Sequence, residues 1–313
     1  MKSINFTKYI PFYFAISGLV IGAGLISLVL WGLKPAIDFV GGSLIQVQIK
    51  STNQTPISET TIRESLAANN IYAQSIQLAS LGKLASLGEQ SAESDWIIRT
   101  KSQEDGLEQK TFEILTEKFG LASISRFESI GPTLGKELLT KTLVAILLSA
   151  GGILIYVAWR FRGGKYGICA NLAMIHDSLV LIGSFSLLGH FRGMEIDTLF
   201  VTALLTILSF SVHDTIVVYD RIRESLRKYP KENFESIANR SINETMGRSI
   251  NNSLTIIFML LALTIFSGVT LKPFALALLI GTITGTYSSP FTAVPLLVVW
   301  NKWERDKRIN DKS

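Results

Sequence analysis

The sequence predicts an α-helical polytopic membrane protein with six transmembrane helices and an α+β domain between the first two. Two observations support this fold class. The chain of 313 residues is 48% hydrophobic and only 18% charged, whereas soluble domains usually carry about 25% charged residues. The apolar residues also gather into blocks, each close to the ~20 residues with which a helix crosses a bilayer. The residues between the first two blocks have the composition of a soluble domain.

The apolar blocks define the predicted spans. They are Phe12–Leu33, Leu138–Trp159, Gly167–Gly189, Leu199–Tyr219, Ile250–Val269 and Pro273–Trp300. The first block is longer than the apolar core of a cleavable signal peptide, so we expect it to stay as an anchor. The single cysteine, Cys169, lies in the third span and excludes an intrachain disulfide.

Basic residues gather at four places: the N-terminus, the loops after the second and fourth spans, and the C-terminal tail. The positive-inside rule therefore places both termini in the cytoplasm and residues 34–137 outside it. This topology accounts for the net charge of +5 without any nucleic acid. At the two membrane surfaces we expect aromatic belts. Their members are Trp159, Tyr219, Trp300 and Trp303 on the cytoplasmic side and Trp31 on the other.

The external domain shows the pattern β-α-β-β-α-β, which is typical of a ferredoxin-like sandwich. Its predicted strands and helices, in order, are Leu44–Ile49, Pro56–Asn70, Ala73–Leu78, Trp96–Thr100, Gly106–Phe119 and Ala122–Ile130. The predicted domains are residues 1–33 (N-terminus and first helix), 34–137 (external domain), 138–300 (helices two to six, with a cytoplasmic loop at 220–248) and a basic tail at 301–313.

Three further local patterns carry predictions. The sequence LASLG occurs at Leu78–Gly82 and again at Leu84–Gly88, which indicates a lengthened hairpin loop or a tip that contacts a passing chain. Phe234–Met246 has one apolar face, so we expect it to lie on membrane lipid, with a docked cytoplasmic partner as the alternative. Small residues predict close helix packing at Gly18 and Gly22 and along span six. The members in span six are Ala277, Gly281, Gly285 and Ser289, and Pro290 and Pro295 should bend its far half.

The most informative residue is Asp214, because it lies within the fourth apolar block. A carboxylate at membrane depth costs roughly 2.5–3.5 kcal/mol, so such a residue usually serves a charge pathway. A polar stripe accompanies it, formed by Thr202, Thr206, Ser209 and His213. In the fifth span, Arg248, Asn251, Asn252 and Thr255 share one helix face. We therefore predict an Asp214–Arg248 ion pair that weakens when Asp214 takes up a proton. The alternative is a fixed bridge that only specifies packing.

A second acidic residue, Asp177, lies in the third span beside His176. Two interpretations stay open: a further proton-relay group, or a hydrogen-bonded packing residue. The three histidines are scattered over the chain and are not expected to bind a metal. There is no Walker-type loop and no spacing of a nucleophile and a base, so we expect no enzyme activity and no cofactor. The expected energy source is an ion gradient.

Several motifs together resemble the SecF family of the bacterial Sec protein translocase. They are IDFVGGSLIQVQ at Ile37–Gln48, ESIGPTLGKEL at Glu128–Leu138, SVHDTIVVYDRIRE at Ser211–Glu224 and NRSINETMGRSINNSLT at Asn239–Thr255. The resemblance covers nearly the whole chain. Besides Asp214 and Arg248, the motifs contain a set of family residues with structural roles: Asp38, Gly41, Gly42, Gly131, Pro132, Asp220 and Arg221.

This resemblance implies half of a resistance-nodulation-division type membrane domain, which works with a homologous SecD subunit beside the SecYEG channel. It implies a proton-driven step that completes export of a translocating polypeptide after the ATP-driven motor has acted. The SecA motor and YajC- or YidC-type proteins are further implied partners. Asp214 matches the proton-relay aspartate of the family, Arg248 matches its arginine, and His213 stands where asparagine is usual. The implied location is the bacterial inner membrane, and also the thylakoid if the source is photosynthetic.

Two other functions compete with this reading. A proton-coupled exporter of small solutes shares the membrane architecture, although such exporters usually have twelve spans and two external domains. A non-transporting scaffold would use the buried charges only to hold helices together.

Overall fold

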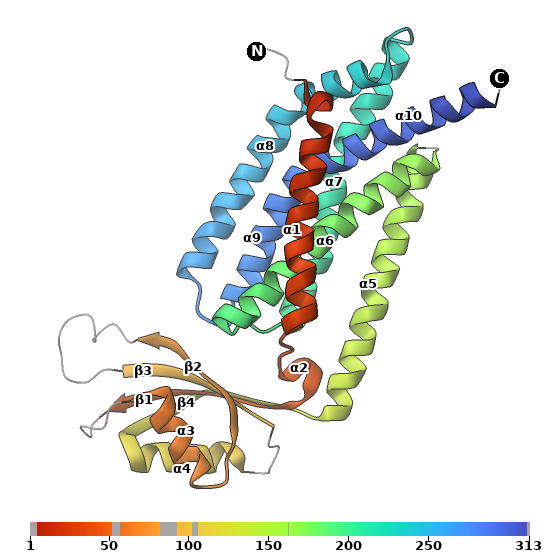
Figure 1. The fold of residues 1–313 in the computed structure, drawn as a ribbon. Coiled ribbons are helices and arrows are strands. Elements are labelled where there is room, and N and C mark those ends of the chain that lie inside the picture. The colour runs from red at the N-terminus through yellow and green to blue at the C-terminus, as the bar shows by residue number, and fades with distance from the viewer. Residues whose placement is uncertain (1–4, 52–56, 82–92, 102–105, 162, 312–313) are drawn as a thin grey trace. The chain divides into compact units, whose positions relative to one another are not determined.

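The computed structural model describes residues 5–51, 57–81, 93–101, 106–161 and 163–311 (Figure 1). The chain divides into two compact units. A helical bundle contains Met1–Lys34, Leu143–Ser267 and Leu271–Ser313. An α+β unit contains Pro35–Thr142 together with Gly268–Thr270. The two units are described separately.

Six helices of the described chain are long and apolar enough to cross a membrane. They are Phe6–Trp31, Pro132–Phe161, Gly164–Arg192, Thr198–Lys228, Phe234–Phe266 and Lys272–Asn310. Each overlaps one of the predicted spans, so the prediction of a mostly helical, multi-pass membrane protein is confirmed. Figure 1 shows that the first of these helices begins, and the last one finishes, at the same end of the bundle.

The helical elements are named as in Figure 1. They are η1 (Phe6–Tyr9), α1 (Ile10–Trp31), α5 (Pro132–Phe161), α6 (Gly164–Arg192), α7 (Thr198–Lys228), α8 (Phe234–Phe266), α9 (Lys272–Ser288), η3 (Ser289–Ala293) and α10 (Val294–Asn310). Capping residues set the ends of several of these helices. Asp197 accepts a hydrogen bond from the backbone N–H of Phe200 at 2.8 Å and caps α7, while Asn233 caps α8 through Ser236 at 2.7 Å. Helix α6 ends at Gly193, whose φ of 66° suits glycine.

Helix α7 is central to the bundle, since it packs against α6, α8 and α9. Close approach to α9 depends on the predicted small face of span six. A Cβ atom added to Gly281 would lie 2.1 Å from Cδ1 of Ile207, and one added to Gly285 would lie 3.3 Å from Cα of Ser211. In α1, the close contact is made by Gly24 rather than by the predicted pair Gly18 and Gly22. Gly24 packs directly on Gly183 of α6, because neither residue has a side chain in the way.

The last span is interrupted by a π-helical turn, η3, between α9 and α10. Pro290 lies in this turn and has no backbone N–H to continue the α-helical pattern. Figure 1 shows α10 leaving the direction of α9 after this turn, as the two prolines predicted. The π-turn is buried at Ser289, Pro290, Thr292 and Ala293.

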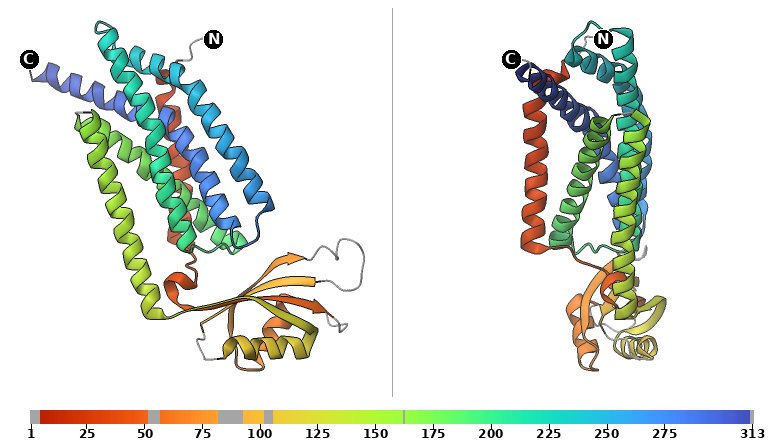
Figure 2. Two further views of the ribbon diagram at one scale, coloured as in Figure 1. Left: turned by 180° about the vertical axis from the view of Figure 1, so that it is seen from behind. Right: turned by 90° about the vertical axis from the view of Figure 1, so that its right-hand side faces the viewer.

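The α+β unit contains one sheet of four antiparallel strands, in the order β2-β3-β1-β4. Its elements are α2 (Ile37–Val40), β1 (Gly42–Ser51), α3 (Glu59–Ala67), β2 (Ala73–Leu81), β3 (Glu93–Thr100), α4 (Leu107–Phe119) and β4 (Gly120–Ile130). Figure 2 shows α3 and α4 together on one face of the sheet. Alternate residues of β1 point to that face, and Ile45, Val47 and Ile49 are fully buried there.

Every predicted strand and helix of this unit overlaps an observed element of the same type. The helices supply Ile62, Leu66, Leu115 and Phe119 to the core, whereas Phe112, which shares the apolar spacing of α4, is exposed. The second LASLG copy, at 84–88, lies outside the described residues, and so does the last residue of the first copy. The interpretation of this repeat therefore stays a prediction.

Candidate functional site

Asp214 lies on α7 and is only 5% exposed. Its Oδ2 atom accepts a hydrogen bond from the hydroxyl of Ser249 on α8, with 2.7 Å between the oxygens. Since α8 packs beside α7, the carboxylate is held at the contact between two membrane helices. A buried carboxylate is costly when it has no donor, so the Ser249 hydroxyl stabilises this placement.

Arg248 does not pair with Asp214 in this structure. Its side chain is exposed, and among the described residues no carboxylate oxygen lies within 4.0 Å of its guanidinium. The physical reason is helical geometry, because adjacent residues point about 100° apart around the axis. Ser249 therefore faces α7 while Arg248 points elsewhere. The predicted Asp214–Arg248 ion pair, whether switchable or fixed, is therefore not formed in this structure.

A set of exposed polar side chains lies on α7 and α8, within two of the helices that are long and apolar enough to cross a membrane. We call it the polar face, and its members are Thr202, Thr206, Ser209 and His213 on α7 and Arg248, Asn251, Asn252 and Thr255 on α8. Exposed residues of this kind are unfavourable against lipid tails. The polar face thus has the chemistry of a surface that another polar membrane helix or water covers.

Asp177 on α6 has hydrogen-bond partners at both carboxylate oxygens, and its side chain is 1% exposed. Its Oδ2 atom accepts hydrogen bonds from Ser211 on α7 and Ser288 on α9, each at 2.6 Å. Its Oδ1 atom lies 2.9 Å from Nδ1 of His176. An ionised carboxylate is well served by three donors of this kind.

His176 extends this network to α1, because its Nε2 atom lies 3.0 Å from the hydroxyl of Ser17. When the imidazole is neutral and carries its proton on Nδ1, Ser17 donates to Nε2 and Nδ1 donates to Asp177. The order serine, histidine, aspartate is that of a hydrolytic triad. A nucleophile must meet its substrate, however, and Ser17 is buried among the helices. The network joins α1, α6, α7 and α9 and is suited to holding a charge or a proton.

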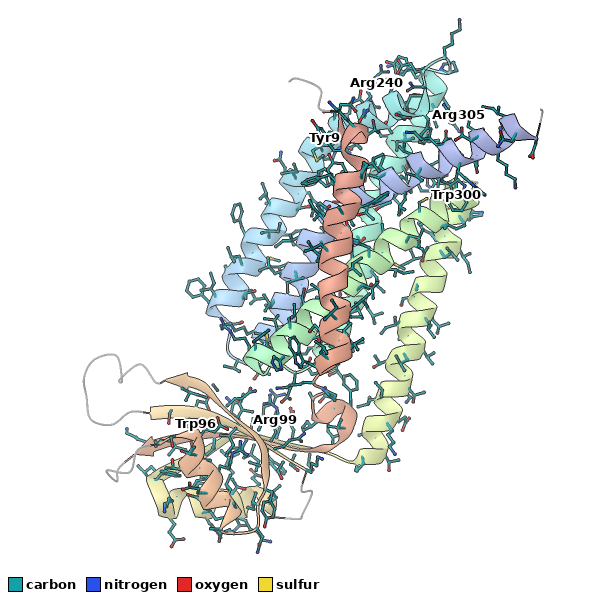
Figure 3. All side chains as sticks on the ribbon, viewed as in Figure 1. Tyr9, Trp96, Arg99, Arg240, Trp300 and Arg305 are labelled. Carbon is teal, nitrogen blue, oxygen red and sulfur yellow. The ribbon has the colours of Figure 1, made fainter. Side chains whose placement is uncertain are left out.

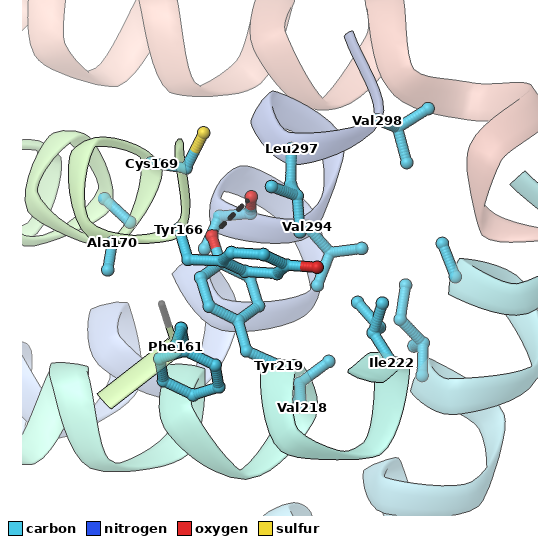
Figure 4. Packing of buried hydrophobic residues seen from close by; sticks show 14 of the residues in the cluster. Phe161, Tyr166, Cys169, Ala170, Val218, Tyr219, Ile222, Val294, Leu297 and Val298 are labelled. Carbon is cyan, nitrogen blue, oxygen red and sulfur yellow. Dashed lines mark hydrogen bonds between the residues drawn. The ribbon is translucent and has the colours of Figure 1, made fainter. Parts of the chain in front are cut away.

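The π-turn meets α7 through two further hydrogen bonds. The hydroxyls of Thr215 and Ser289 are 3.0 Å apart, and the hydroxyl of Tyr219 donates to the backbone carbonyl of Ala293 at 3.0 Å. Figure 4 shows Tyr219 enclosed by Phe161, Tyr166 and Ile222. The predicted place of Tyr219 in the cytoplasmic aromatic belt is therefore wrong, because the residue is completely buried. Trp159 and Trp303 are exposed, as belt residues should be.

Sequence reasoning found the two aspartates but missed their hydroxyl partners. Ser211, Ser249 and Ser288 were not singled out as donors, since single serines are common in membrane helices and bond their own backbone. In the structure, Ser211 and Ser288 each lie on the buried side of their helices. Their meeting at one carboxylate is a tertiary contact between residues 34 and 111 positions from Asp177.

At one end of the bundle, Asp220 and Arg221 form ion pairs on the surface. Asp220 pairs with Arg160 of α5 at 3.0 Å, and Arg221 pairs with Glu224 at 2.7 Å and with Glu244 of α8. These exposed pairs contribute little stability each, but they join α5, α7 and α8. Figure 3 shows Arg240, Trp300 and Arg305 at this same end.

The first part of α8 corrects a prediction. Its apolar face was expected to lie on lipid, but Ile237, Ala238 and Ile242 are buried against the core of the bundle. Phe234 and Met246 pack on the same core. The chain itself therefore covers this face, and α8 continues through it as one helix to Phe266.

The family residues of the first two motifs meet in the α+β unit. Gly41 and Gly42 have φ angles of 77° and 130°, which residues with a side chain rarely adopt. A Cβ atom on Gly41 would lie 2.9 Å from Cα of Pro132, the first residue of α5, which follows Gly131. Asp38 lies half-buried in the first turn of α2. These residues form a tight crossing of two chain segments and take no part in the Asp214 and Asp177 networks.

Comparison with known families matches residues 111–303 to the family described as protein export membrane protein SecD/SecF, C-terminal. The protein translocase subunit SecF of Thermobaculum terrenum is 43% identical over 304 residues, which cover 95% of this chain and 94% of that protein. SecF of Anaerolinea thermophila is 39% identical over 298 residues, covering 93% and 92%. SecF of Synechocystis sp. is 36% identical over 283 residues, covering 88% and 85%.

Two solved structures have the same fold over most of this chain. The crystal structure of SecDF from Thermus thermophilus, described as a translocon-associated membrane protein, matches with a TM-score of 0.81 and 28% identity. The match covers 96% of this chain but 39% of that one. A SecDF crystal structure in a super-membrane-facing form matches with a TM-score of 0.70 and 28% identity, covering 100% of this chain and 40% of the other. This chain thus spans less than half of each solved chain.

Proposed function

Since the chain belongs to the SecF subunits of the SecD/SecF protein export family, we propose that it is an auxiliary subunit of the Sec translocase. In this proposal it uses the proton motive force to complete the export of polypeptides after the ATP-driven step. The observation that carries the proposal is Asp214, a carboxylate buried at membrane depth with Ser249 as its hydrogen-bond donor. Ionisable residues in this position are characteristic of proton pathways.

The coupling step works through the two ionisation states of Asp214. As a carboxylate it accepts hydrogen bonds only, and as a carboxylic acid it donates one. Taking up a proton therefore changes its preferred partner between α7 and α8. Arg248 is exposed one residue from Ser249, so a rotation of α8 by up to about 100° would bring its guanidinium toward the ionised group. Proton uptake and release would thus alternate Asp214 between the hydroxyl and the guanidinium and move α8 against α7.

A SecD-like subunit is the proposed partner at the polar face. The face bears a cation, Arg248, and a row of amides and hydroxyls, so its partner should present an acidic or hydroxyl-rich membrane helix. The solved SecDF chains are more than twice as long as this one, which supports a second subunit here. The SecYEG channel, the SecA motor and YajC- or YidC-type proteins are proposed as further neighbours, on the family resemblance.

The proposed location is the bacterial inner membrane, with both termini cytoplasmic. The support is the distribution of basic residues: Arg240 and Arg305 lie near the chain ends of the bundle. The α+β domain, residues 34–137, then lies outside the cytoplasm. We infer a ferredoxin-like sandwich for it, supported by the element order β-α-β-β-α-β and by the strand order β2-β3-β1-β4.

The test is the variant Asp214→Asn, which keeps the shape of the side chain and removes its ionisation. Inverted vesicles carrying it should insert the protein normally but lose the stimulation of export by a proton gradient. The matched control is Asp220→Asn, which alters an exposed acidic residue of the same helix. Export by Asp214→Asn at the wild-type rate, with the gradient applied, would refute the proposed role of this carboxylate.

A further inference from the structure

We propose that Asp177 is a positioning residue for Asp214: it holds the π-turn of span six against α7 and so sets the rotation of α7. This inference rests on the proposed function for the importance of Asp214, but its geometric content can be tested without it. It also decides between the two interpretations that the sequence left open for Asp177, in favour of a hydrogen-bonded residue that acts through its neighbours.

The first observation is that one oxygen of Asp177 joins two other helices. Ser211 of α7 and Ser288 of α9 both donate to Oδ2 at 2.6 Å, and all three side chains are buried. Ser288 is the last residue of α9, directly before the π-turn. Asp177 therefore fixes the point where span six leaves its α-helical course.

The second observation is that this contact is one of three along a single stripe of α7. Ser211, Thr215 and Tyr219 are spaced four residues apart, which places them on one side of the helix. Thr215 meets the hydroxyl of Ser289, and Tyr219 donates to the carbonyl of Ala293. The three contacts follow Ser288 and the π-turn in order, so they fix how α7 is rotated about its own axis.

The rotation of α7 decides where Asp214 points. If α7 turned about its axis by one residue position, which is about 100°, the Asp214 carboxylate would point away from Ser249. Among the three contacts, the one at Asp177 is the strongest by type, because both serines donate to a carboxylate oxygen. The carboxylate is itself held from the other side by His176, which is in turn bonded to Ser17. Asp177 therefore has no freedom to follow α7 if the helix turns.

The experiment measures the contact between α7 and α8 directly. In a Cys169→Ala background, Asp214→Cys and Ser249→Cys are introduced together, and the rate of disulfide formation with an oxidant is followed in native membranes. Disulfide formation demands a narrow geometry, so its rate reports the direction of position 214. This readout needs no proton transport, because Asp214 is already replaced.

Three changes are then added singly to the cysteine pair. Asp177→Ala removes both serine contacts and should slow crosslinking about tenfold, the effect of losing a hydrogen bond to a charged group. Asp177→Asn keeps one oxygen to accept from both serines and should crosslink much closer to the unmodified rate than Asp177→Ala does. The matched control, Ser186→Ala, removes another buried interhelical bond of α6, to Ser27 at 2.7 Å, and should have no effect.

Export is measured in parallel, in chains that retain Asp214 and Ser249. Asp177→Asn should support export and Asp177→Ala should not. Should Asp177→Ala fail to insert, Ser288→Ala replaces it, with slower crosslinking expected. Unchanged crosslinking in both Asp177→Ala and Ser288→Ala would overturn the proposal. The proposal would also be overturned if Asp177→Asn crosslinked normally but supported no export, because the negative charge of Asp177 would then be required for export. Failure of the proposed function would be seen separately, as normal export by Asp214→Asn.

Discussion

The hydroxyl of Ser249 donates to the carboxylate of Asp214 across 2.7 Å, and this bond links α8 to α7 inside the bundle. We predict that Ser249→Ala lowers gradient-stimulated export by up to about tenfold, because a typical hydrogen bond contributes roughly 0.5–1.5 kcal/mol to the state that contains it. The measurement is the export rate of a reporter polypeptide into inverted vesicles. Ser253→Ala is the control, since Ser253 lies one turn along α8 and bonds Thr286 instead. Equal export by the two variants would argue against a role for Ser249.

Tyr219→Phe tests the anchor at the far end of the π-turn. The change removes the bond from the tyrosine hydroxyl to the Ala293 carbonyl, so the free energy of unfolding should fall by about 0.5–1.5 kcal/mol. Thermal unfolding of the purified protein in detergent measures the loss. Tyr166→Phe is the matched control, because this neighbouring ring belongs to the same core cluster. A midpoint for Tyr219→Phe that equals the wild-type value would contradict the assigned bond.

Gly281→Ala should disturb the packing of α9 on α7. The added Cβ would lie 2.1 Å from Cδ1 of Ile207, which forces a shift that typically costs about 1–3 kcal/mol. Adding Ile207→Val should recover part of the loss, because the two residues share one contact. Gly22→Ala is the control, since nothing lies within 4 Å of its added Cβ. Thermal unfolding of the wild type, Gly281→Ala, Ile207→Val, the double variant and Gly22→Ala tests this, and strict additivity of the double variant would contradict the contact.

Arg248→Ala should weaken association with a SecD-like subunit without changing the stability of the chain itself. The side chain is exposed and has no described carboxylate within 4.0 Å, so its removal should leave thermal unfolding of the isolated chain unchanged. If the polar face is covered by a SecD-like subunit, the same variant should reduce copurification of that subunit from mild detergent. Arg305→Ala, which alters an exposed arginine of the tail helix, is the control. Undiminished copurification with Arg248→Ala would assign the partner surface elsewhere.

The six spans could be predicted from the sequence because a bilayer imposes a length and a composition on each helix separately. The elements of the α+β unit could be predicted equally well. Ile45, Val47 and Ile49, for example, alternate along the sequence as a half-buried strand does. Both signals are local, and neither requires knowledge of which elements become neighbours.

The hydrogen-bond partners within the site could not be predicted from the sequence, because they depend on how each helix is rotated about its own axis. Sequence spacing made Arg248 the expected neighbour of Asp214, yet the adjacent Ser249 faces α7. Tyr219 was assigned to the membrane surface from its position at the end of an apolar block, but the residues that bury it come from α5, α6 and span six. The apolar face of residues 234–246 was assigned to lipid for the same reason. A single chain shows that a face is apolar and does not show what covers it.

The π-turn at Ser289–Ala293 also bears on how relatives of this chain should be aligned. The i→i+5 pattern of this turn holds one residue more than an α-helical turn, so a one-residue deletion inside it would restore a plain α-helix without turning α10 on α9. Val294, Leu297 and Val298, which now fill the core, would then keep their places. Gaps of one residue at this point in an alignment are therefore expected to leave the pattern of apolar residues downstream unchanged. A one-residue gap placed further along α10 would instead turn every later residue by about 100° around the helix axis.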